Sequence, residues 1–264
     1  MNQKSIDLAT TRPVFSRRTL LAGTAAIAIG GGHLTRVAAQ EATPAASPSG
    51  DADAVQLLND AAAAMTALET FAFEVVTARG ETQILEGFTL KEISGVVRRP
   101  TDFETTVSVE IPFASIDLTA VSVDNEVWIE LPSFGDQAGG WQSLGTSDGL
   151  LSLLNPDVLI LEAVRYIEDA AIDRTGDLDG VDVTFVTGTV DFRGIARQLA
   201  GDETELANQI AEGPVSLTVA IDGEQRVREI EIAGPLLAAE EANVIRLVTF
   251  SSFNEPVEIT EPEV

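Results

Sequence analysis

The chain has 264 residues, of which 42 are acidic and 16 basic, so its formal net charge is −26 at pH 7. A surface this acidic repels nucleic acid and anionic lipid head groups, which excludes nucleic-acid binding. Apolar residues make up 45% of the chain, which excludes a largely disordered protein and is enough for a sizeable core.

Residues 1–39 have the pattern of an export leader. The pair Arg17-Arg18 precedes an apolar run at 20–32 that is rich in glycine and alanine, and small residues follow up to Ala39. This pattern is typical of a signal peptide, and the arginine pair is similar to a twin-arginine signal. The apolar run is shorter than the roughly 20 residues that span a bilayer. We therefore predict cleavage after Ala39, export to an extracytoplasmic location and no stable membrane anchor, with an uncleaved anchor as the alternative.

Removal of the leader would leave a chain without histidine or cysteine. The only histidine is His33, and the sequence contains no cysteine. The commonest general base at neutral pH and every thiol nucleophile are therefore missing. Disulfides cannot stabilise the exported protein, so a hydrophobic core must do so. We expect no metal, no cofactor and no enzymatic activity.

A linker and a helix open the mature part. Residues 40–52 are rich in Ala, Pro and Ser and indicate a low-complexity linker. A helix is predicted over 53–68, with Asp51 or Asp53 as its N-cap. Its single apolar stripe, on an otherwise alanine-rich helix, predicts packing against a sheet. The stripe consists of Val55, Leu58, Ala62, Met65 and Leu68.

Alternating apolar and polar residues predict an antiparallel meander in the first half of the domain. Asp124-Asn125 is typical of a tight hairpin between two of its strands. A bend at Gly87 or Gly95 divides the longest apolar segment into two strands. The predicted strands are 71–78, two within 83–99, 103–111, 116–123 and 126–131.

The second half combines a loop, helices and more strands. A glycine-rich loop that carries Trp141 is expected at 132–149, and residues 254–264 predict a frayed acidic tail. Helices are expected at 150–154, at 156–163 and within 192–211. Strands are expected at 166–174, 181–190, 215–221, 226–232 and 243–253.

These elements predict an α+β fold in one domain, residues 53–253. Its architecture is a single curved antiparallel β-sheet, a half-open barrel of about 10–11 strands. Four or five helices are expected, packed on the concave side of the sheet.

Acidic clusters are the only candidates for catalytic or metal-binding chemistry. Glu168-Asp169 and Glu240-Glu241 could act as acid and base, but in a chain with 42 acids such neighbours are expected on any solvated face. Three aspartates lie around one predicted turn, without the spacing of an EF-hand loop, and suit the turn itself. They are Asp173, Asp177 and Asp179. The large aromatic residues are candidates for ligand stacking or for the core. They are Trp128, Trp141 and Tyr166.

The predicted sheet has more apolar strand surface than four or five short helices can cover. A curved sheet with an incompletely filled apolar face forms a cavity for apolar ligands. The alternative, in which helices and loops fill that space completely, stays open. The candidate lining residues are Phe88, Ile93, Val97, Phe103, Val107, Val109, Ile116, Leu118 and Val183.

Several short stretches, in this order and spacing, resemble the mycobacterial-type LppX/LprA/LprF/LprG-like lipoprotein family. They are 127–129 with Trp141, 178–182 leading into 186–190, and 219–223 with 227–230. The resemblance covers about 53–253. It implies a half-open barrel similar to periplasmic lipoprotein carriers, and an apolar cavity that carries lipids. Family members bear a lipid-modified cysteine that this sequence lacks, so a carrier without that anchor is implied.

The sequence therefore predicts an extracytoplasmic lipid-binding or lipid-carrier protein. Its expected ligand is an acylated lipid or glycolipid, and we expect a monomer that an envelope protein could join as a partner. The alternative is a non-catalytic envelope interaction or stress-sensing module on the same scaffold, with a filled core and an exposed apolar patch. A hydrolase that uses two carboxylates would require two buried acids in a cleft.

Overall fold

The computed structural model describes residues 48–85, 87–133, 139–146, 164–195 and 209–263. Residues 44–264 form one compact unit, to which the following refers. The described residues contain one complete helix, α1 (Ala52–Thr66), short helical segments at 164–165 and 192–195, and a single sheet of twelve strands. The strands are β1 (Thr70–Arg79), β2 (Thr82–Leu85), β3 (Phe88–Arg98), β4 (Asp102–Ile111), β5 (Ala114–Val123), β6 (Glu126–Leu131), β7 (Gly140–Thr146), β8 (Glu168–Leu178), β9 (Val181–Val190), β10 (Val215–Asp222), β11 (Val227–Ala233) and β12 (Ile245–Ser251).

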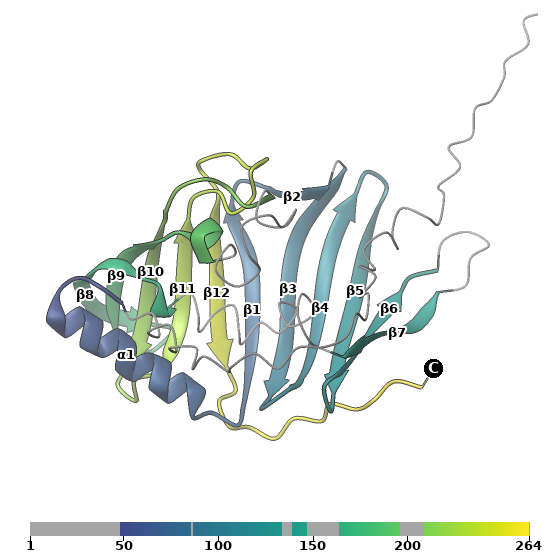
Figure 1. The fold of residues 1–264 in the computed structure, drawn as a ribbon, viewed down its shortest axis with the longest axis horizontal. Coiled ribbons are helices and arrows are strands. Elements are labelled where there is room, and N and C mark those ends of the chain that lie inside the picture. The colour runs from purple at the N-terminus through teal and green to yellow at the C-terminus, as the bar shows by residue number, and fades with distance from the viewer. Residues whose placement is uncertain (1–47, 86, 134–138, 147–163, 196–208, 264) are drawn as a thin grey trace, which may run out of the picture. The chain divides into compact units, whose positions relative to one another are not determined.

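The sheet consists of two antiparallel meanders joined by β1 (Figure 1). The strand order is β7-β6-β5-β4-β3-β1-β12-β11-β10-β9-β8, and β2 pairs with β3. The sheet does not close, because β7 and β8 lie at its two ends. This architecture confirms the prediction of one antiparallel half-open barrel, with twelve strands in place of 10–11.

Tight turns set the register of the hairpins. Asp124 and Asn125 have φ values of 51° and 71° and join β5 to β6 in two residues. Asp179 and Gly180, with φ values of 52° and 85°, join β8 to β9 in the same way. Positive φ at both central residues matches the twist of the flanking strands, which explains Asp, Asn and Gly at these positions.

The strand β7 corrects the predicted loop at 132–149. Residues Gly140–Thr146 pair with β6, so Trp141 lies in a strand. This strand was missed because Gly140 and Gly145 interrupt its alternation. The predicted helices at 150–154 and 156–163, and most of 192–211, lie outside the described residues. The expected bend lies at Gly87, whereas Gly95 is an internal position of β3.

The helix α1 lies across the β8–β11 part of the sheet (Figure 1). It begins after Asp51, as predicted, and the Asp51 carbonyl accepts the first helical hydrogen bond, from Val55, at 2.9 Å. The buried face is rotated slightly from the predicted stripe, since Val55 is only half-buried. It consists of Ala54, Leu58, Ala61, Ala62 and Met65. Because the three alanines and Leu58 have small or medium side chains, the helix approaches the sheet closely.

Arg99 holds the end of α1 against the sheet. Its guanidinium donates hydrogen bonds to the carbonyl oxygens of Met65 and Leu68, the latter at 2.7 Å, and lies 5.3 Å from the centre of the Phe71 ring. A cation at a helix C-terminus satisfies free carbonyls and complements the helix dipole. Arg99 thus joins three elements: the helix end, β1 and the turn after β3.

We expect Arg99→Met to destabilise the protein by about 2 kcal/mol, because charged hydrogen bonds to two carbonyls are lost while the aliphatic stem is kept. Urea unfolding followed by circular dichroism measures the change. Arg79→Met serves as the control, since Arg79 is exposed at the end of β1. An equal effect of the two substitutions would contradict the capping role of Arg99.

The segment after β12 is held against the sheet, so the prediction of a frayed tail is wrong at least to Ile259. The Asn254 N–H donates to the Thr70 carbonyl at 2.8 Å, and the Thr70 hydroxyl donates to the Glu255 carbonyl at 2.6 Å. Arg98 donates to the Ile259 carbonyl at 3.2 Å, and Ile259 is only 4% exposed. Hydrogen bonds and one buried side chain thus fix this segment along the ends of β1 and β3.

A polar network around Asp102 joins the start of β4 to two neighbouring strands. Asp102 accepts hydrogen bonds from Arg98 at 2.8 Å and from the Asp124 N–H at 3.0 Å. Burial alone would raise the pKa of the Asp102 carboxyl, but the hydrogen bonds from Arg98, Asp124 and Thr101 together lower it below its ordinary value.

The lowered pKa of Asp102 predicts a stability contribution that depends on pH. The folded state favours the carboxylate, so the contribution is full above the ordinary Asp pKa of about 3.9 and is lost as pH falls through the lower folded-state value. We expect Asp102→Asn to be less stable than the wild type at pH 7 and to approach it at about pH 2. Urea unfolding of both proteins across this range tests the difference. A gap that is constant with pH would contradict it.

A buried ion pair fixes the β11–β12 connection. Glu240 and Arg246 form a direct ion pair, with side chains 0% and 4% exposed. Glu240 also accepts the backbone N–H groups of Leu236 and Leu237, at 2.8 and 3.0 Å, and Arg246 donates to the Thr82 hydroxyl at 2.7 Å. Every charge in this cluster is therefore compensated, and β12 is tied to β2 as well as to its own loop.

Candidate functional site

The register brings eight of the nine predicted lining residues to one face of β3–β5. The pairs Val97–Phe103, Ile93–Val107, Val107–Leu118 and Val109–Ile116 are direct cross-strand neighbours, and Phe88 follows by alternation. We call the surface that these residues share, with its continuation on β6, the β3–β6 face. The eight residues are Phe88, Ile93, Val97, Phe103, Val107, Val109, Ile116 and Leu118.

Burial divides this face from the rest of the same sheet surface. Across β10–β12, on the side that bears α1, apolar side chains are fully buried, as Leu217, Val219 and Ile230 are. Of the eight predicted residues on the β3–β6 face, only Val97, Phe103 and Val109 reach that level, at 0–3% exposure. Four of the eight are half-buried: Ile93, Val107, Ile116 and Leu118. Phe88 is 40% exposed. The part of this face that these five residues form is therefore apolar and only partly buried by the rest of the protein.

The same face contains apolar residues that were absent from the sequence prediction. Leu90 pairs with the buried Val109, and Ala120 pairs with Ile129. Leu90, Ala120 and Ile129 therefore share the face, and all three are half-buried. The tight turn at Asp124-Asn125 fixes the Ala120–Ile129 pairing, so these two could have been found from the sequence. Leu90 could not, because a register shift between Leu90 and Glu92 changes the alternation of β3.

The opposite face of β3–β5 is polar. Lys91 Nζ lies 2.5 Å from Glu110 Oε2, and the Ser108 hydroxyl donates to Asp117 at 2.7 Å. The hydrogen bond to Glu110 raises the pKa of the Lys91 ammonium, which favours its charged form. The sheet thus presents charge on one side and hydrocarbon on the other.

Val183 is not part of the β3–β6 face. It packs with Phe185 and Ala220 in a separate cluster on the other face of the sheet, because successive residues of a strand point to opposite faces. β9 is apolar on both faces, so alternation alone could not assign the side on which Val183 lies.

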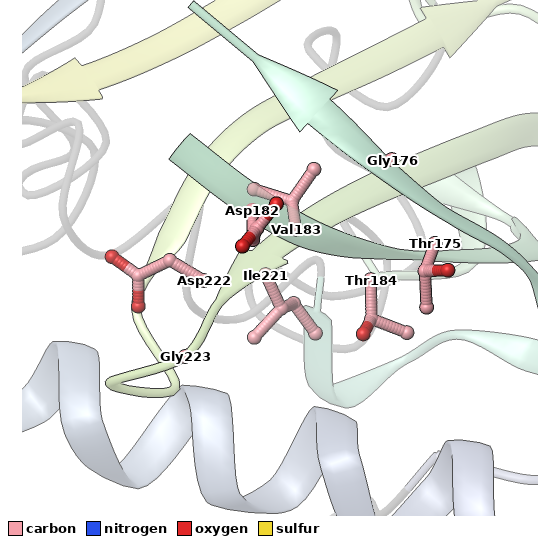
Figure 2. A pocket seen from close by; sticks show the side chains of 8 residues that line it. All are labelled: Thr175, Gly176, Asp182, Val183, Thr184, Ile221, Asp222 and Gly223. Carbon is pink, nitrogen blue, oxygen red and sulfur yellow. The ribbon is translucent and has the colours of Figure 1, made fainter. Parts of the chain in front are cut away.

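Val183 instead borders a pocket of about 390 Å³ at the ends of β8–β10, which Figure 2 shows. Most of its wall is polar, from Thr175, Asp182, Thr184 and Asp222. Asp222 is already engaged, since it accepts two backbone N–H groups at 2.9 Å and pairs with Arg226 at 3.0 Å. This lining does not suit a hydrocarbon chain.

Two of the three aspartates around the β8–β9 turn have structural partners. Asp177 accepts the Gly180 N–H at 2.9 Å within the β8–β9 turn, and Asp173 pairs with Arg174 at 2.6 Å. Glu168 and Asp169 are exposed. Burial, with the nearby charges of Glu231 and Asp179, raises the pKa of the Glu229 carboxyl. Among the described residues, no group of three or more His, Cys, Asp or Glu side chains is placed to hold a metal ion.

Two of the three aromatic candidates lie in packed positions, and Trp141, in β7, is half-buried. Trp128 is 4% exposed and pairs with Val121 on the face opposite the β3–β6 face, and Tyr166 packs against the main core.

No helix within the described residues is long and apolar enough to cross a membrane.

Comparison with known families gives a match over nearly the whole described domain. The model of the LppX_LprAFG lipoprotein family matches residues 53–259. The chain belongs to this family. The matched range includes β12 and the docked segment to Ile259, so the LppX_LprAFG domain extends beyond the predicted limit at 253. None of the curated protein sequences compared with the chain matches it.

Solved structures of this LppX_LprAFG type share the fold. LprF from Mycobacterium bovis matches with a TM-score of 0.54 and 14% identity, over 81% of this chain and 99% of that one. LppX from Mycobacterium tuberculosis matches with a TM-score of 0.51 and 19% identity, over 80% of this chain and 100% of that one. LppX is a lipoprotein, and at these identities the likeness of both structures to this chain concerns the fold.

Proposed function

We propose that this protein is an extracytoplasmic lipid carrier that holds the acyl chains of a lipid or glycolipid against the β3–β6 face. The observation that carries the proposal is the incomplete cover of an apolar sheet face in a member of the LppX_LprAFG lipoprotein family. Half-buried Ile93, Val107, Ile116 and Leu118 offer hydrocarbon contact without a polar partner to compete for it.

The energetics favour capture of a long chain. Burial of a chain of about 16 carbons is worth on the order of 10 kcal/mol gross, at roughly 0.8 kcal/mol per methylene. Loss of rotational and conformational freedom offsets part of this gain. Micromolar binding corresponds to about 8 kcal/mol net, so the gross gain is of the size that reversible capture of a long chain requires.

The remaining parts of the proposal concern location and state. The arginine pair at 17–18 and the apolar run that follows support cleavage after Ala39 and twin-arginine export. A sequence without cysteine supports a carrier that is not lipid-modified. We propose a monomer without enzymatic activity. Three of the acids considered for chemistry support this, since Asp177 serves a turn and Asp173 and Glu240 form ion pairs.

The test is direct detection of bound lipid. Native mass spectrometry after mild purification should show a mass increment that organic extraction removes, and a fluorescent fatty acid should bind with one saturable site. An envelope interaction module on the same scaffold would show neither. Absence of both signals would reject the carrier function.

A further inference from the structure

A phenylalanine stands in solvent at the tip of the β4–β5 hairpin. Pro112-Phe113 form the two-residue loop, which the pair Ile111–Ala114 closes. Phe113 is 98% exposed, whereas the other exposed large apolar side chains of the described residues range from 36% to 46%. A ring so fully surrounded by water makes no contribution to the core, so its cost in solubility indicates a contact outside this fold.

The tip continues into the β3–β6 face. Behind the Ile111–Ala114 pair come Val109–Ile116 and then Val107–Leu118. Phe88 lies at the same end, because the next residue of β3, Thr89, pairs with Glu110. The path from Phe113 along β4 to Val107, at the half-buried centre of the face, therefore crosses only apolar side chains, over roughly 20 Å of strand.

The tip itself is uncharged, and the acids beside it have polar partners. Residues 111–116 are uncharged, in a chain of net charge −26. Glu110 on one side pairs with Lys91 at 2.5 Å, and Asp117 on the other accepts a hydrogen bond from Ser108 at 2.7 Å. An uncharged tip on an acidic protein can approach a zwitterionic or uncharged lipid layer. An anionic lipid layer, in contrast, repels the acidic surface of the rest of the protein.

The size of the tip favours a lipid layer over a protein partner. One phenylalanine buries about 150–250 Å², far below the roughly 800 Å² per partner of a stable protein interface. A lipid interface accepts a single apolar loop, because affinity there scales with the apolar area that enters the layer.

We propose that Pro112 and Phe113 insert into a zwitterionic or uncharged lipid layer and bring the adjoining end of the β3–β6 face to it, so that acyl chains pass directly between layer and protein. This role rests on the proposed carrier function, but contact with the layer is measurable without it.

Flotation of the full chain with phosphatidylcholine vesicles tests the contact. We expect the wild type to float with the vesicles and Phe113→Ser to reduce the bound fraction about tenfold, which is the loss expected from one phenyl ring. Ile172→Ser is the matched control, since Ile172 is 46% exposed in β8 and distant from the tip in strand order. It should float like the wild type. Because Phe113 is 98% exposed, its replacement should leave thermal stability unchanged.

Three results would overturn the inference. The wild type could fail to float, or the Phe113→Ser variant could float equally well. The third is self-association in sedimentation velocity that Phe113→Ser abolishes, which would make a second copy the occupant of the tip. Fatty-acid binding in vesicle-free buffer separates this inference from the carrier function. Flotation without fatty-acid binding would support docking and reject the carrier, and fatty-acid binding without flotation would do the reverse.

Discussion

Glu240→Ala is expected to lower the free energy of unfolding by about 3–5 kcal/mol, because it leaves the Arg246 guanidinium buried without its counter-charge. The Leu236 and Leu237 N–H groups would lose their acceptor at the same time. Urea unfolding measures the change, and lipid binding by the folded fraction should persist, since the pair lies outside the β3–β6 face.

Two variants control for this effect. Lys91→Gln removes an ion pair whose partners are 48% and 56% exposed, and should change stability little. The double variant Glu240→Met with Arg246→Met removes both buried charges and should recover part of the loss, as replacement of buried pairs by apolar side chains does elsewhere. A loss from Glu240→Ala no larger than that from Lys91→Gln would show that Arg246 finds water when Glu240 is removed.

Val107→Asp is expected to weaken fatty-acid binding by about 10- to 100-fold, or about 1.4–2.8 kcal/mol at 1.4 kcal/mol per tenfold change. The new carboxylate would lie between Ile93 and Leu118, where an acyl chain would have to displace its water. Val107 is half-buried, so the free protein should tolerate the substitution. Titration with a fluorescent fatty acid measures the affinity.

Thr106→Asp is the matched control for Val107→Asp. It introduces the same charge one residue earlier in β4, on the opposite face of the sheet, and Thr106 is half-buried like Val107. Its affinity for the fatty acid should match that of the wild type. Equal weakening by both variants would indicate a general electrostatic effect and would count against binding on the β3–β6 face.

Local signals in the sequence were sufficient for most of the sheet. Alternation in 103–111 and the turn Asp124-Asn125 determine both strand position and facing, so the apolar side of β4–β6 could be predicted. The signals failed where glycines, which usually indicate a loop, lie within a strand. Gly140 and Gly145 made β7 resemble a loop, although the strand needs only backbone groups to pair with β6.

The candidate site was predictable in composition but less so in extent. Alternation is regular in β4 and β5 and places their predicted residues on one face, whereas Phe88 joins Ile93 and Val97 only through the register shift in β3. Val183 lies in a strand that is apolar on both sides. Incomplete cover cannot be derived from strand patterns, since it depends on how far α1 extends across the sheet. Within the described part of the chain, the helix covers β8–β11, and that position leaves the other half of the apolar surface without a helix over it.

The docked segment after β12 determines where this polypeptide can be shortened. A fragment that stops at Phe253 would deprive the Thr70 hydroxyl and the Arg98 guanidinium of their main-chain acceptors and would remove the Ile259 side chain from its place among the strand ends. Expression of the domain for crystallisation or ligand screening should therefore retain residues through Ile259, and cleavable fusions belong beyond that point.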